Sequence, residues 1–111
     1  MKISLQQALA KLPLPASSKW PQGVCDVEVF QRAGLSLEIF APKDNDYQTP
    51  HAQDELYIVA RGSGTLLLDD NPIEFETGDV LFVAARRPHR FVRYTADMAL
   101  WVVFWGPHHE G

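Results

Sequence analysis

Short runs of alternating apolar and polar residues follow one another along most of the chain. In "VCDVEVF", residues 24–30, Val27 and Val29 lie on one side and Asp26 and Glu28 on the other. The run "LSLEIF", residues 35–40, has the same period of two, and "QRAG" between the runs fits a hairpin turn. This alternation predicts two β-strands.

Six further runs predict strands, and turn or loop residues separate them. The predicted strands are residues 55–60, 65–69, 72–75, 79–84, 89–94 and 98–105, with "RGSG", "DN" and "ETG" among the turns. About eight short strands at such intervals indicate an antiparallel sandwich or small barrel, and not β-α-β units. The predicted fold class is therefore all-β.

The first residues follow a helical pattern instead. Ser4 and Gln7 fit a capping box, and Pro13 and Pro15 end the helix. One apolar stripe is formed by Leu5, Ala8, Leu9 and Leu12. We predict a helix and loop over residues 1–22 and a single β-barrel domain over residues 23–111.

The last predicted strand, "MALWVVFW", is apolar at almost every position. A strand that is buried on one face only should alternate, so its second face also needs a cover. A homodimer interface would cover this face, and so would the N-terminal helix. We expect a homodimer, although the pattern alone does not separate the two.

Composition narrows the class of protein further. The chain has 111 residues, 46% apolar and 22% charged, which suits one soluble domain. A net charge of −4 argues against nucleic acid as the main partner. No apolar run is long enough to span a bilayer, and the N-terminus is a poor signal peptide, so we expect no membrane partner and a cytoplasmic location. The single cysteine, Cys25, agrees with a reducing compartment.

The stretch "PHAQDELYIVARGSG", residues 50–64, carries the first candidate chemistry. His51 and Glu55 are four residues apart, which is about 13 Å along a straight strand. Two ligands of one metal ion must each place a donor atom about 2 Å from it. We therefore expect a strand that ends near His51, a turn, and a new strand from Glu55, with both side chains facing the same interior.

A second segment, "GDVLFVAARRPHRF", residues 78–91, carries another candidate ligand. Gly78 and Asp79 form a turn signal before a strand, and His89 opens the next strand after a proline. His89 can therefore face the same cavity as His51.

These two segments resemble the two motifs of the cupin superfamily, small β-barrels of the germin type. In the first motif a histidine precedes a glutamate, and six residues separate the glutamate from a glycine, as His51, Glu55 and Gly62 do here. In the second motif Gly78 and His89 fall at the family spacing. The chain departs from the family pattern where Thr49 replaces the first histidine, Ala84 a proline, Arg86 a glycine and Arg93 an asparagine.

The chain is also similar to a group of small single-domain cupins with a "DxQxPHxQDExYxV" block. Matching residues are Asp46, Gln48, Pro50, His51, Gln53, Asp54, Glu55, Tyr57 and Val59. The resemblance covers roughly residues 23–107 and implies a double-stranded β-helix, or jelly-roll barrel, with a short N-terminal helix.

The resemblance implies one divalent metal ion held by His51, Glu55 and His89. Two histidines and one carboxylate suit iron, manganese, nickel or zinc, so the metal stays open. Further candidates for a weak donor, a bound water or a substrate contact are Gln48, Thr49 and Gln53. Tyr57 is the candidate catalytic residue, although such a tyrosine is more often a packing residue with a satisfied hydroxyl.

We therefore predict a metal-binding cupin that binds a small organic molecule inside the barrel. If it is an enzyme, metal-dependent dioxygenase chemistry comes first, and isomerase or lyase chemistry second. The alternative is a non-catalytic binding or sensor module without metal, in which the histidines only form hydrogen bonds with each other or with Glu55.

Overall fold

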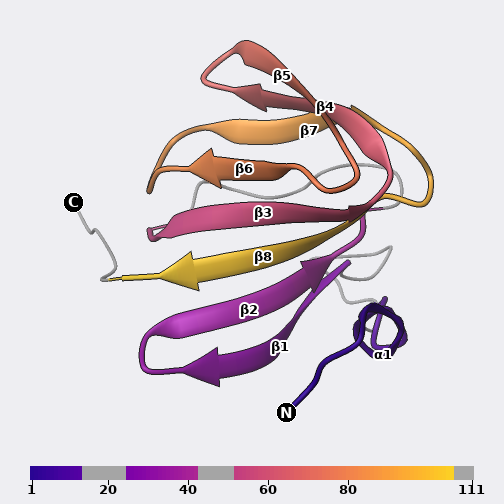
Figure 1. Cartoon of the computed structure of the whole chain (residues 1–111). Coiled ribbons are helices and arrows are strands. Elements are labelled where there is room, and N and C mark those ends of the chain that lie inside the picture. Colours follow the sequence, from indigo (N-terminus) through magenta and orange to yellow (C-terminus); the bar gives the residue numbers. More distant parts are fainter. Residues whose placement is uncertain (14–24, 43–51, 107–111) are drawn as a thin grey trace, which may run out of the picture.

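Two antiparallel β-sheets form opposite walls of the molecule (Figure 1). The structure is a computed structural model that describes residues 1–13, 25–42 and 52–106. Its elements are α1 (Leu5–Leu9), β1 (Asp26–Arg32), β2 (Leu35–Phe40), β3 (Asp54–Arg61), β4 (Ser63–Leu68), β5 (Asn71–Glu76), β6 (Val80–Val83), β7 (His89–Tyr94) and β8 (Ala99–Trp105).

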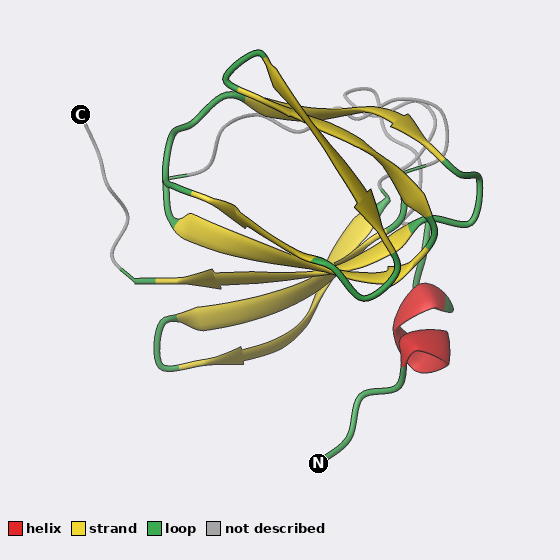
Figure 2. Ribbon diagram, turned by 45° about the horizontal axis from the view of Figure 1, so that its top comes forward, coloured by secondary structure: helices red, strands yellow, loops and turns green. Residues whose placement is uncertain are grey.

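The larger sheet has the strand order β1-β2-β8-β3-β6, and the smaller sheet has the order β5-β4-β7. Figure 2 shows the two groups of strands from another side. Neighbouring strands are often distant in sequence, because the chain crosses repeatedly between the two walls. This arrangement confirms the predicted all-β jelly-roll fold with one short helix. The domain boundary predicted between residues 22 and 23 lies outside the described residues.

The core lies between the two sheets and is rich in aromatic rings. Phe91 of β7 packs edge-on against Tyr57 of β3 and Phe75 of β5, with ring centroids 5.0 and 5.6 Å apart. Phe40 of β2 lies 5.9 Å from the same ring. Residues of both sheets thus close the middle of the barrel with apolar contacts.

The polar side of β1 and β2 faces the barrel interior. Residues paired across an antiparallel ladder lie on the same face of the sheet. Glu38 pairs with Val102, and Ser36 pairs with Phe104, and both partners on β8 are buried inner residues. The acidic positions of these strands therefore point inward together with Phe40, while Val27, Leu37 and Ile39 lie on the opposite face.

The outer face of the larger sheet carries two unbroken apolar rows that cross all five strands. The first row is Val27, Ile39, Trp101, Ile58 and Val80. The second row is Phe30, Leu37, Val103, Leu56 and Phe82. We call these ten residues the outer apolar face.

The helix α1 begins with the predicted capping box. The Ser4 hydroxyl accepts a hydrogen bond from the Gln7 backbone, and the Gln7 side chain accepts one from Ser4 N. The helix ends earlier than predicted, at Leu9, because its last turn tightens into the Lys11 N–Ala8 O and Leu12 N–Leu9 O bonds. Within the described part of the chain, no helix is long and apolar enough to cross a membrane.

The predicted turn "RGSG" is wrong. Strand β3 runs to Arg61 and β4 begins at Ser63, so Gly62 alone separates them. Its φ of +91° bends the chain at one residue, and it passes within close range of Thr95 and Met98. A single glycine therefore carries the chain from the larger sheet into the smaller one.

Candidate metal centre

Glu55 and His89 meet inside the barrel although they come from opposite sheets. Glu55 is the second residue of β3, and His89 is the first residue of β7. Glu55 Oε1 and His89 Nε2 are 2.8 Å apart, and each side chain is only 1% exposed. The two predicted ligands of the described chain thus converge on one buried point.

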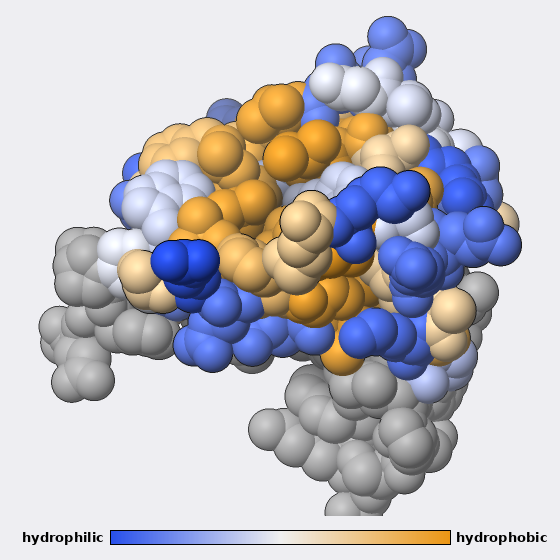
Figure 3. All heavy atoms as spheres, turned by 60° about the horizontal axis from the view of Figure 1, so that its bottom comes forward, coloured by the Kyte–Doolittle hydropathy of each residue, from blue (hydrophilic) through white to orange (hydrophobic). Residues whose placement is uncertain are grey.

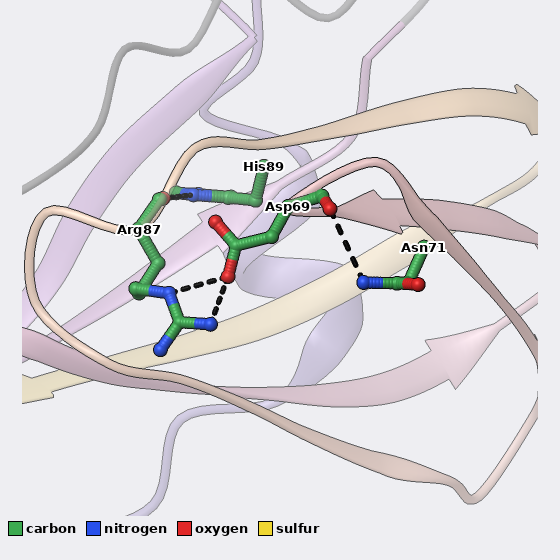
Figure 4. Close-up of polar contacts among 4 residues, drawn as sticks. All are labelled: Asp69, Asn71, Arg87 and His89. Atoms are coloured by element: carbon green, nitrogen blue, oxygen red, sulfur yellow. Dashed lines mark hydrogen bonds and ion pairs between the residues drawn. The ribbon is translucent and has the colours of Figure 1, made fainter.

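Backbone contacts orient the imidazole of His89. Its Nδ1 lies 2.8 Å from the carbonyl oxygen of Arg87, which only accepts hydrogen bonds, so Nδ1 is the protonated nitrogen (Figure 4). In the neutral ring this leaves the Nε2 lone pair directed at Glu55. Such a second contact at Nδ1 is the usual way in which proteins orient a metal-binding histidine.

The loop that carries His89 is itself held by the β4–β5 turn. Asp69 forms an ion pair with Arg87 (Figure 4). It also donates its backbone N–H to Pro88 O, at 2.9 Å. The Asp69 carboxylate raises the pKa of Arg87. Arg87 and Arg93 pair with acidic surface residues, which agrees with a solvated basic segment and not with an anion site.

The second oxygen of Glu55 indicates that the centre is incomplete. Glu55 Oε2 is buried and has no hydrogen-bond partner within residues 1–13, 25–42 and 52–106. A buried carboxylate oxygen without a partner is costly, and a cation beside it would remove that cost. Two donors about 2.0–2.1 Å from one ion at a right angle are roughly 3 Å apart, so the 2.8 Å spacing of Glu55 and His89 fits a shared ion.

Three of the other predicted site residues lie in a part of the chain that the structure does not describe. His51, Gln48 and Thr49 lie outside the described residues. In the described part, no group of three or more histidine, cysteine or acidic side chains is placed to hold a metal ion. The full set of His51, Glu55 and His89 therefore stays a prediction, and it depends on His51.

Gln53 is bound to the end of β8, where its side-chain N–H donates to Gly106 O at 2.8 Å. It also lines a pocket of about 370 Å³ beside the β1–β2 hairpin. Its place at a pocket wall is compatible with the predicted substrate contact, which stays a prediction.

Tyr57 is fully buried, and its hydroxyl lies 3.1 Å from His89 Nε2. The hydroxyl can donate to that nitrogen, so the tyrosine has a satisfied hydroxyl and packs edge-on against Phe91. This environment favours a positioning residue for His89 over a catalytic acid.

The sequence interpretation missed a pair of carboxyl groups on the inner wall. Asp26 and Glu38 share a hydrogen bond, and the pKa of Glu38 is raised to about 8, with burial as the largest cause. The hydrogen bond and the charge of Asp26 contribute to this same shift, and so do the charges of Glu28 and Glu55. The signal was present in the alternation of β1 and β2, but that pattern does not say which face turns inward.

Comparison with known proteins agrees with this architecture. The family model described as a cupin domain matches residues 36–105, which is more than half of the chain. The chain belongs to the cupin family. An uncharacterized protein of Streptomyces coelicolor, SCO3923, is 36% identical to this cupin over 83 residues, which are 73% of this chain and 79% of that one.

Solved structures show the same fold at low identity. A protein from Neisseria meningitidis, NMB1881, superposes with a TM-score of 0.70 at 17% identity and covers 96% of this cupin and 100% of that chain. KdgF from Halomonas sp. superposes with a TM-score of 0.64 at 16% identity, over 74% of this cupin and 77% of that chain. A cupin superfamily protein from Desulfitobacterium hafniense gives 0.61 at 19% identity, over 74% and 76%.

Proposed function

We propose that this cupin binds one divalent metal ion through His51, Glu55 and His89 and uses it to bind a small organic molecule inside the barrel. The observation that carries the proposal is the buried contact between Glu55 and His89, with the second Glu55 oxygen unsatisfied among the described residues. Two histidines and one carboxylate leave positions open for a ligand.

A bound ion of this kind would supply Lewis-acid chemistry or activate a water or dioxygen. The chain's own contribution is to hold His89 through Arg87 O and to keep Glu55 away from solvent. Tyr57 and the ion would compete for the same Nε2 lone pair, so its hydroxyl holds His89 in place when no ion is bound. Dioxygenase chemistry is our first choice of reaction, and isomerase chemistry the second.

The competing function is a binding or sensor module without metal. Its support is the same contact, because a protonated His89 would satisfy Glu55 Oε1 without any ion. Metal content separates the two functions.

The test is elemental analysis of the purified protein after growth in medium supplemented with iron, manganese, nickel and zinc. We expect close to one ion per chain, and a loss of at least about tenfold in affinity when His89 or His51 is replaced by alanine. The matched control is a His108→Ala, His109→Ala double variant, which removes the other two histidines of the chain. Metal-free wild-type protein, or equal loss in the control, would contradict the proposal.

We also propose that the outer apolar face is the interface of a homodimer. Val80 and Phe82 are 58% and 52% exposed, while Ile39, in the first row, is fully buried. Figure 3 shows apolar residues gathered on this side of the molecule. Soluble monomers rarely expose a large continuous apolar patch. A second copy presents the same uncharged rows, so two such faces can bury each other without leaving a charge unpaired.

A cytoplasmic location is likewise a proposal, supported by the lone Cys25 and by the absence of apolar runs of membrane-spanning length in the sequence.

A further inference from the structure

The pocket beside the β1–β2 hairpin has an acidic wall. Its volume is about 370 Å³, which is large enough for a small organic molecule. Its lining residues are Glu28, Gln31, Gly34, Leu35, Ser36, Glu38, Ala52, Gln53, Phe104 and Gly106. Among the residues that the structure describes, this lining includes two glutamates and no lysine, arginine or histidine, so nothing in its described part favours an anionic ligand.

The pocket has part of its wall on the sheet face that also carries Glu55. Ser36 and Glu38 of β2 and Phe104 of β8 face inward, and Phe104 pairs directly with Glu55. A molecule in this pocket would therefore lie beside the strand that carries Glu55.

Two carboxyl groups of this wall differ in their partners. Glu28 is exposed and accepts a hydrogen bond from the Ser36 hydroxyl at 2.7 Å. Glu38 is half-buried and shares a hydrogen bond with Asp26, another carboxyl group. Burial and the neighbouring carboxyl group both favour the protonated form of Glu38.

We propose that Glu38 selects a ligand with a protonated amine, which replaces the proton on Glu38 when the ligand binds. No bond to carbon forms or breaks, since the amine brings one positive charge into the pocket and one proton leaves to solvent. The aromatic ring of Phe104 gives the rest of the ligand an apolar surface. This inference rests on the proposed small-molecule role of the barrel, and it does not require the metal ion.

An inorganic cation fits this wall less well than an amine. The acidic side chains near Glu38 are Asp26 and Glu28 from β1 and Glu55 from β3, all of which raise its pKa. Even so, no three of the described acidic, histidine or cysteine residues are placed to share a metal ion. An amine can donate separate hydrogen bonds to carboxylates that do not converge on one point.

The test uses three probes of similar size and different charge: benzylamine, benzyl alcohol and benzoate. Binding to the purified full chain is measured by calorimetry at pH 8, where about half of Glu38 is ionised, and metal content is determined in the same preparation. We expect benzylamine to bind roughly tenfold more tightly than benzoate, because a partly solvated carboxylate at close range attracts one and repels the other. The variant Glu38→Gln should lose most of this preference and leave benzyl alcohol binding unchanged.

The pH dependence gives a second readout. Benzylamine keeps its charge between pH 6 and 8, as alkyl amines do, whereas Glu38 has a pKa of about 8. Ionised Glu38 attracts the amine and protonated Glu38 does not, so affinity should rise with pH over this range, with proton release on binding. Glu38→Gln should flatten the profile, and the exposed Glu76→Gln control on β5 should not.

Three results would overturn the inference. They are benzoate binding as tight as benzylamine, an unchanged preference in Glu38→Gln, and displacement of benzylamine by Mg²⁺ at equal concentration, which would make the wall a site for inorganic cations. Because probe selectivity and metal content are separate measurements, a failed amine preference leaves the metal proposal standing, and a metal-free protein leaves the amine preference testable.

Discussion

The hydroxyl of Tyr57 donates to the same imidazole nitrogen that we propose as a metal donor. In Tyr57→Phe that hydrogen bond is lost while the ring keeps its edge-on contact with Phe91. We expect a fall of about 1 kcal/mol in the free energy of unfolding of metal-free protein, the usual effect of one buried hydrogen bond. Urea unfolding measures this change.

The same variant should keep its full metal content, because His89 Nε2 then has no competing donor. A protein that loses its ion in Tyr57→Phe would show instead that the hydroxyl supports the ion, and our assignment of Tyr57 as a positioning residue would be wrong.

Glu55 and His89 could be singled out from the sequence because both lie at the spacing of a known motif, and their role as metal ligands stays a prediction. Glu55 and His89 meet because one lies at the second residue of β3 and the other at the first residue of β7, in opposite sheets. Glu38 could not be predicted in this way. Alternation identifies the two faces of a strand, but an acidic face usually turns to solvent, and here it turns inward.

The pairing of β4 with β7 depends on a close approach between their backbones. At Gly64, an added Cβ would meet the carbonyl oxygen of Arg93 and come within 2.8 Å of Tyr94 Cα, both of them backbone atoms that cannot turn aside. Gly34, in the β1–β2 hairpin, has open space around it and only an unfavourable φ of +84°.

We therefore expect Gly64→Ala to lower the free energy of unfolding by about 3 kcal/mol, in the upper range for overpacking. Gly34→Ala should lower it by about 1 kcal/mol, the cost of a left-handed backbone conformation for an L-residue. Thermal or urea unfolding of the two variants provides the comparison. Equal effects would mean that β4 can move away from β7 at little cost.

Most strands could be predicted from the sequence, and two of them, β2 and β7, to the residue. The errors occur where two strands follow each other almost without interruption. Polar and small residues in "RGSG" have the composition of a turn, yet only Gly62 leaves the strand conformation. Turn composition cannot distinguish a hairpin from a chain that passes into another sheet, because that choice depends on tertiary contacts.

At the scale of the whole molecule, we expect the outer apolar face to form the interface of a homodimer. Replacing Val80 and Phe82 by aspartate places two charges on side chains that are already more than half exposed. The monomer should tolerate the change, whereas a dimer would have to bury four charges. Light scattering coupled to size-exclusion chromatography should therefore detect a dimer for wild type and a monomer for the variant.

The matched control is Val92→Asp on β7, which is 46% exposed but belongs to the smaller sheet. This variant should remain dimeric. A monomeric wild-type protein would mean that another part of the chain or a different partner covers the face.

The contact between Glu55 and His89 joins one wall of the barrel to the other. Any breathing motion that parts the walls must first pull these two side chains away from each other. An ion bound between them would accordingly hold the two sheets together, and a chelator that removes it should lower the stability of the whole barrel.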